Sequence, residues 1–134
     1  MTRGIRNNNP LNIRHGKSRW VGMSEVQTDK GFVQFQSRVY GYRAAFVLLR
    51  NYMAQGYDTI TKIIGRWAPP TDGNNTRSYI GHVSMTTGID ANRKLSFVNK
   101  TELVEIVKSM AQIESAVIED RALIEMAYDL AKDK

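Results

Sequence analysis

The sequence predicts a mainly α-helical domain with a small β-hairpin near its N-terminus. Apolar residues recur every three or four positions through most of the chain, which is the period of an amphipathic helix. Near the N-terminus two short apolar–aromatic runs replace this period, as is typical of short strands. No internal repeat or low-complexity linker interrupts the 134 residues, so we expect a single domain over residues 1–134.

The first third of the chain is predicted to be irregular or extended. Residues 1–16 are rich in Arg, Asn and Gly, which favour loops, and we expect an irregular basic arm there. The runs RWVGM and GFVQF follow, separated by SEVQTDK. Their aromatic and β-branched residues predict a β-hairpin or two short strands.

The rest of the chain is predicted to be helical. Five helices are expected, over residues 37–55, 59–68 and 75–88, from 99 through 114 and beyond, and over 120–132. Gly56 and Gly88 can adopt the left-handed conformation that ends a helix. Asp58 and Asn99 can cap helix N-termini with their side chains.

Glu114 lies where the helical pattern calls for an apolar residue. One face of its helix carries Leu103, Val107, Met110, Ala111, Val117 and Ile118. Glu114 projects into this face, about 20° from Leu103. Burial would raise its pKa and keep it protonated, as the general acid of a glycosidase requires. Alternatively, Glu114 pairs with Arg43 or Arg77, or simply marks the end of the helix.

Composition excludes several classes of function. Cysteine is absent, which excludes disulfides, thiolate metal sites and cysteine nucleophiles, and His15 and His82 are too far apart in sequence to suggest a metal. We therefore expect neither a metal nor an organic cofactor. The net charge of +6 favours a polyanionic partner, either nucleic acid or a bacterial envelope. No apolar run is long enough to span a membrane, and the basic N-terminus lacks the apolar stretch of a signal peptide.

Three fragments resemble motifs of the superfamily of goose-type lysozymes and lytic transglycosylases. "IES", containing Glu114 and Ser115, resembles the motif that ends their catalytic helix. "GFVQF", with Gln34, is similar to their GLMQ motif, and "NNTRSYIGHV", with Tyr79, resembles their ETRxYVxxV motif. The motifs occur in a different order here, with that of Glu114 last instead of first. A circularly permuted lysozyme-like fold would account for this order.

Longer stretches resemble a family of small bacteriophage and prophage proteins. They include RGIRNNNPLNIR, TDKGFVQFQS, DTITKIIGRWAPP and NTRSYIGHVS. Members are described as lysozyme-like endolysins or as virion structural proteins. Their usual opening has Gly where Leu11 stands, their HENG segment is IESA in this chain, and TDGNN lacks an acidic residue that often precedes the Asn-x-Thr of that family.

These resemblances imply a muramidase or lytic transglycosylase that cleaves the glycan strand of peptidoglycan. Glu114 would be the general acid, and Asp29 would be either a second catalytic carboxylate or absent from the mechanism, as in a transglycosylase. Gln34, Tyr79 and Ser115 would line the site. Asn9 and Asn12 offer amides for sugar hydroxyls, and Trp20 a ring for stacking; local turn and core roles are the alternatives for these three.

An endolysin of this kind would be made in the host cytoplasm without a signal peptide and released through a holin to lyse the host, or it would be associated with the virion. We expect a monomer. Two other functions are open. One is a non-catalytic virion component that keeps a lysozyme-like scaffold and binds other phage proteins. The other is a nucleic-acid-binding helical domain, which is disfavoured because Lys and Arg are spread along the whole chain.

Overall fold

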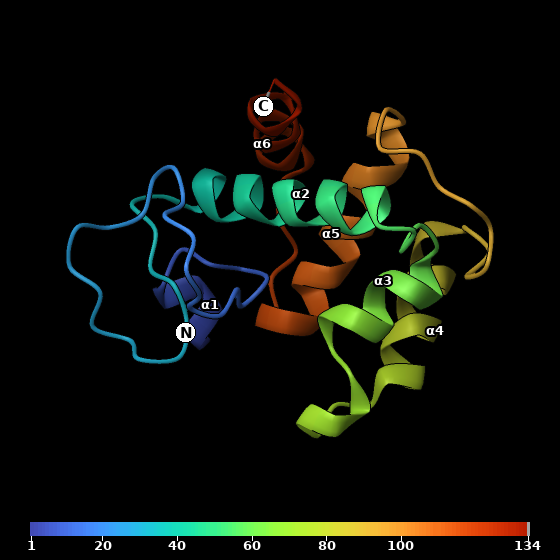
Figure 1. Cartoon of the computed structure of the whole chain (residues 1–134), viewed down its shortest axis with the longest axis horizontal. Helices are drawn as coiled ribbons and strands as arrows, with labels where there is room; N and C mark the ends of the chain where they lie inside the picture. The colour runs from blue at the N-terminus through green and yellow to red at the C-terminus, as the bar shows by residue number, and fades with distance from the viewer. Residues whose placement is uncertain (134) are drawn as a thin grey trace.

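The computed structural model describes residues 1–133, which form six α-helices and one 3₁₀ turn (Figure 1). The elements are α1 (Arg3–Arg6), α2 (Arg38–Ala54), α3 (Ile60–Trp67), η1 (Pro70–Asp72), α4 (Thr76–Thr87), α5 (Lys100–Ser115) and α6 (Arg121–Lys132). The predicted helical class is therefore confirmed, and α2 to α6 have boundaries within a few residues of those expected. The expectation that residues 1–16 are wholly irregular is wrong, because Arg3–Arg6 form the single turn of α1. None of the helices formed by residues 1–133 is long and apolar enough to cross a membrane.

Helix α2 runs across the middle of the molecule and packs chiefly against α6 (Figure 1). Helix α5 packs against α4 and α6, and α3 packs against α4. Fully buried side chains from different helices meet between them, among them Phe46, Ile64, Val107 and Ile124. Burial of each such side chain contributes about 1.5–3 kcal/mol, so this core fixes the helices that carry Glu114 and Tyr79.

The helix ends follow the predicted capping pattern with one exception. Asn99 caps α5, and Gly88, with φ +73°, ends α4. The prediction that Asp58 caps α3 is wrong. Thr59 does so, because it has the extended backbone of a cap residue and its hydroxyl accepts a hydrogen bond from the N–H of Lys62 at 3.1 Å.

The predicted N-terminal β-hairpin is wrong. Residues 1–133 contain no β-strand, and the segments RWVGM and GFVQF share one isolated bridge, between Met23 and Phe35. A second bridge joins Arg14 to Phe32. The two segments lie side by side as expected, but the ladder does not extend beyond single bridges.

Side-chain amides explain why the ladder stops. The Nε2 of Gln27 donates to the carbonyl oxygens of Ser24 at 2.9 Å and Gln34 at 2.8 Å, and its Oε1 accepts from the N–H of Gln34 at 2.8 Å. The Oε1 of Gln34 in turn accepts from the N–H groups of Thr28 and Asp29. These side chains occupy backbone groups that a second strand would otherwise bind.

The N-terminal segment docks on the end of α5. The hydroxyl of Thr2 donates to the carbonyl of Ser115 at 2.8 Å, and the hydroxyl of Ser115 donates to the carbonyl of Pro10 at 2.7 Å. A Cβ at Gly4 would overlap the Ser115 hydroxyl, so only glycine allows this close approach. The first residues of the chain therefore hold the helix turn that carries Glu114.

Helix α5 ends earlier than the apolar pattern indicates. Ser115 is its last residue, and Ala116 adopts a left-handed conformation with φ +54°. Val117 and Ile118, predicted on its apolar face, therefore lie beyond the helix, and Ile118 is exposed. Glu114 is the residue before the last in α5, so the alternative that it marks the end of the helix agrees with its position.

Ala116→Gly is expected to raise the free energy of unfolding by about 0.5–1 kcal/mol, because the left-handed conformation costs a non-glycine residue about 1–2 kcal/mol, partly offset by the greater flexibility of unfolded glycine. Urea denaturation would measure this. The matched variant Gly88→Ala, which places alanine in the same conformation, should lower it by a similar amount. A loss of stability in Ala116→Gly would contradict the explanation.

Candidate functional site

Glu114 lies in the last turn of α5 and is half-buried. Its Oε2 accepts a hydrogen bond from the hydroxyl of Tyr79 at 3.1 Å, and its Oε1 accepts one from the Nδ2 of Asn12 at 3.2 Å. The same Nδ2 also donates to the backbone carbonyl of Glu114 at 3.0 Å. Three distant parts of the sequence, the N-terminal segment, α4 and α5, therefore meet at this carboxyl group.

The environment raises the pKa of the Glu114 carboxyl above its ordinary value. Burial is the main cause, and it is opposed by the hydrogen bonds from Asn12 and Tyr79 and by the positive charge of Arg14. Within residues 1–133 no Lys, Arg or His forms an ion pair with Glu114, so the alternative of a partner such as Arg43 or Arg77 is wrong. The Glu114 carboxyl group accordingly keeps its proton to a higher pH than the carboxyl group of an exposed glutamate does.

Tyr79 is suited to donate to this carboxyl group. It is only 6% exposed, and burial together with the Glu114 charge raises its pKa well above its ordinary value. Its hydroxyl therefore stays neutral and keeps its proton, which points to Oε2 of Glu114. Tyr79 reaches this position from the first turns of α4, which begins where Asn75 accepts a hydrogen bond from the N–H of Ser78.

Glu114 and Tyr79 line an open pocket of about 420 Å³ between α4 and α5. The other lining residues are Asn74, Asn75, Ser78, His82 and Ile113. We call this the Glu114 pocket. Ser78 and His82 were not among the predicted site residues. His82 lies three residues after Tyr79 and four after Ser78, which places it on the same helical face as both and is a signal present in the sequence. The amides, hydroxyls and imidazole supply donors and acceptors for a polar ligand.

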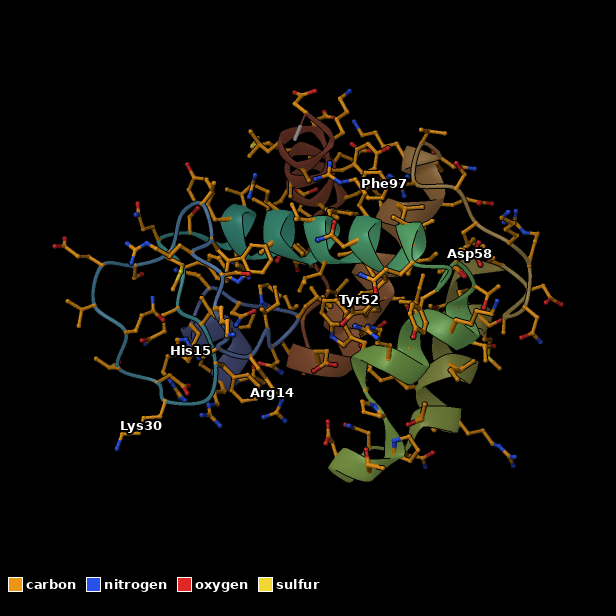
Figure 2. The ribbon with its side chains drawn as sticks, viewed as in Figure 1. Arg14, His15, Lys30, Tyr52, Asp58 and Phe97 are labelled. Carbon is orange, nitrogen blue, oxygen red and sulfur yellow. The ribbon has the colours of Figure 1, made fainter. Side chains whose placement is uncertain are left out.

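A second pocket, of about 370 Å³, is lined in part by Asn12, whose Nδ2 donates to the Glu114 carboxyl group. Its walls include Trp20, Tyr52, Trp67, Arg14 and Arg66, and we call it the aromatic–arginine pocket. Trp20, predicted to stack on a sugar ring, lies in this wall, and Arg14 belongs to the basic arm expected over residues 1–16. Arg66 and Tyr52 were missed because nothing in the local sequence brings them to the N-terminal segment. Figure 2 labels Arg14, in the N-terminal segment, and Tyr52, on α2, which both line this pocket.

Asp29 occupies a different place from the one its predicted role requires. Its carboxylate accepts hydrogen bonds from Arg3 at 2.7 and 2.5 Å, from Asn7 at 2.9 Å, and from the N–H groups of Gly31 at 2.9 Å and Phe32 at 3.0 Å. The bond from Arg3 and then that from Asn7 hold the pKa of this carboxyl well below its usual range. Both oxygens of Asp29 therefore serve the fold of its loop.

Gln34 shares a pocket with Asp29 and not with Glu114. This pocket, of about 470 Å³, is lined by Arg3, Arg6, Asn7, Thr28, Asp29, Lys30 and Gln34. The side-chain oxygen of Gln34 binds backbone N–H groups in the same loop. The structure thus brings together Glu114, Tyr79 and Asn12 of the predicted site residues, and it sets Asp29 and Gln34 apart from them.

Two other predicted site residues hold the N-terminal segment in place. Asn9 is completely buried; its Nδ2 donates to the carbonyls of Ile13 and Val33, and its Oδ1 accepts from the N–H of Ile13. Ser115 is 1% exposed and binds the carbonyl of Pro10. Their polar atoms position Asn12 and Glu114 instead of facing either pocket. Residues 1–133 contain no cluster of three His, Asp or Glu side chains suited to a metal ion.

Comparison with known proteins relates the chain to a phage protein. The chain is 39% identical over 117 residues to Protein P5 of Pseudoalteromonas phage PM2, and the alignment covers 84% of this chain and 71% of that protein. It belongs to the Protein P5 family. No family model matches the sequence. The Protein P5 relationship confirms the prediction of a phage-protein family, while the resemblance to lysozymes stays a prediction.

Removing the Glu114 carboxyl is expected to change how stability depends on pH. The folded-state pKa of Glu114 lies above its unfolded value, so wild-type stability falls as pH rises through that interval, by about 1.4 kcal/mol per unit of elevation. Glu114→Gln lacks this loss. The difference in melting temperature, that of Glu114→Gln minus that of wild type, should therefore be larger at pH 8 than at pH 4. A difference that is the same at both pH values would contradict the burial of this carboxyl group.

Asp29→Asn is expected to have the opposite pH dependence. The folded-state pKa of Asp29 is depressed, so its stabilising effect is complete above its unfolded pKa and is lost as pH falls below about 4. The variant should melt at a lower temperature than wild type at pH 7, and the gap should narrow at pH 3. Thermal melts followed by circular dichroism would measure both. Lys17→Gln, an exposed charge change in the same N-terminal region, serves as control.

Proposed function

We propose that the chain is a phage enzyme that cleaves the glycan strand of peptidoglycan, with Glu114 as the general acid. The observation that carries this proposal is the setting of Glu114: a carboxyl group with an elevated pKa, oriented by Tyr79 and Asn12, at the wall of an open polar pocket. A protonated carboxylic acid facing a polar cleft is what cleavage of a glycosidic bond requires.

The chemistry needs one carboxyl group in two successive roles. Glu114 donates its proton to the glycosidic oxygen as the bond from that oxygen to C1 breaks, and C1 takes on oxocarbenium character. The resulting carboxylate then accepts a proton from the nucleophile that bonds to C1. This nucleophile is either water, giving a reducing end, or the 6-hydroxyl of the same muramic residue, giving a 1,6-anhydro ring.

The position of Asp29 favours the 6-hydroxyl as nucleophile. A hydrolase with two carboxylates needs the second one across the cleft from the acid. Asp29 lines a different pocket and its oxygens are already bound to Arg3 and Asn7. Among the predicted residues Glu114 is then the one carboxyl group at the cleft, so we propose the transglycosylase route. Tyr79 and Asn12 hold its two oxygens in place through both steps.

A non-catalytic phage structural protein is the second candidate. Ile118, Met126 and Leu130 are 79%, 56% and 42% exposed. Exposed apolar side chains of this size on and just before α6 suit contact with another phage protein. Release through a holin and association with the virion both fit a phage protein, and the enzyme could act from either place.

Mass spectrometry of muropeptides would test the proposed function. Gram-negative sacculi incubated with the wild type should release fragments with 1,6-anhydromuramic ends, and Glu114→Gln should reduce their yield by about 10²-fold or more, because the proton donor is lost. Glu25→Gln, an exposed glutamate changed in the same way, should behave like wild type. Reducing ends would indicate hydrolysis instead. Absence of products from folded wild type across several sacculi would favour the structural role.

A further inference from the structure

We propose that the aromatic–arginine pocket binds the acidic peptide stem of peptidoglycan beside the cleaved linkage, so that the protein prefers peptide-bearing strands to bare glycan. The inference rests on the proposed function of Glu114. It extends that function by assigning recognition of the peptide stem to a pocket separate from the Glu114 pocket. Asn12 connects the two places, since it lines this pocket and donates to the Glu114 carboxylate.

Two arginines of this pocket have charges without a carboxylate partner. The guanidinium of Arg66 lies 4.9 Å from the ring centre of Tyr52 and 4.8 Å from that of Tyr57, and that of Arg14 lies 5.1 Å from the ring centre of Phe32. In the part of the chain covering residues 1–133, neither forms an ion pair with Asp or Glu. Stacking on aromatic rings holds the guanidinium groups in position and leaves N–H donors for an anion.

The other walls suit a peptide joined to a sugar. Trp20, Tyr52 and Trp67 supply apolar faces for the sugar ring and the aliphatic parts of the peptide. The indole N–H of Trp67 donates to the carbonyl of Leu11 at 3.3 Å, which fixes that ring. Asp72 also lines the pocket and offers an acceptor for an amino group. A stem peptide carries carboxylates and an amine together, which matches this set of charges.

The same set of charges disfavours nucleic acid in this pocket. A phosphate backbone presents negative charge alone, and Asp72 would repel it. The pocket is also a local hollow of about 370 Å³, whereas a nucleic-acid strand is usually followed by a continuous basic groove. Carboxylates of a short peptide can reach Arg14 and Arg66 while Asp72 binds the amine.

Arg14 links occupancy of this pocket to Glu114. Its positive charge lowers the pKa of the Glu114 carboxyl, which opposes the protonated state that the first step needs. A substrate carboxylate on Arg14 would offset that charge. A bound peptide stem would thereby favour the protonated acid as well as the position of the strand.

Binding measurements test the inference without requiring cleavage. The Glu114→Gln protein is titrated with the disaccharide tetrapeptide and with the same disaccharide lacking its peptide, and tryptophan fluorescence or calorimetry gives the two dissociation constants. We expect the peptide-bearing ligand to bind about ten-fold tighter or more, because its carboxylates form charge-assisted hydrogen bonds that the bare disaccharide lacks. Arg66→Gln and, separately, Arg14→Gln in that background should each remove most of the preference.

Lys94→Gln, which removes an exposed positive charge outside this pocket, is the matched control and should keep the preference. Arg14→Gln provides a test even if Arg66→Gln fails to fold. Equal dissociation constants for the two ligands would overturn the inference. The inference would also be overturned if Arg14→Gln, Arg66→Gln and Lys94→Gln all kept the same preference for the peptide-bearing ligand. Tighter binding of a short oligonucleotide, which the tetrapeptide ligand fails to displace, would overturn it too.

Cleavage assays separate this inference from the proposed function. Wild type is given intact sacculi and sacculi stripped of peptide by an amidase, and the inference predicts faster cleavage of the intact ones. Cleavage of both at equal rates would overturn the peptide preference and leave the role of Glu114 standing. Peptide-selective binding with no cleavage of either substrate would overturn the proposed reaction and support the pocket assignment.

Discussion

The site depends on the hydrogen bonds that the Asn12 amide forms with Glu114. Its Nδ2 donates both to the backbone carbonyl and to the carboxylate of that residue, across 102 positions of sequence. The last carbonyls of a helix have no partner within the helix, so Asn12 supplies one from the N-terminal segment. The same contact orients the carboxyl group toward Tyr79 and connects the Glu114 pocket to the aromatic–arginine pocket, which Asn12 lines.

This arrangement costs stability at Asn12 itself. Its backbone has φ +54°, and its Oδ1 is the one buried side-chain oxygen or nitrogen without a hydrogen-bond partner among residues 1–133. A buried polar atom left unsatisfied costs about 1–3 kcal/mol. The neighbouring bonds of Thr2, Asn9 and Ser115 hold the segment against that cost. Strain retained by surrounding structure is typical of functional positions.

The sequence predicts local features better than distant contacts. Helix periods and caps predict α2 to α6 because their causes lie within a few residues. Glu114 stands out for the same reason, and Tyr79 was placed beside it only through resemblance to a known motif. The hairpin prediction is wrong because the side chains of Gln27 and Gln34 bind backbone groups, and strand propensity does not include such contacts. The bonds of Asp29 to Arg3 and Asn7 join separate segments, which no local pattern indicates.

The end of a helix is a suitable place to keep a carboxylic acid protonated. The C-terminal end of α5 carries the partial negative charge of the helix dipole, which disfavours a second negative charge on Glu114 and acts in the same direction as burial. Asn12, Tyr79 and Arg14 act in the opposite direction. Because these effects oppose one another at a single carboxyl group, offsetting the charge of Arg14 would raise the pKa of Glu114 further. A ligand that carries its own carboxylate would provide that change.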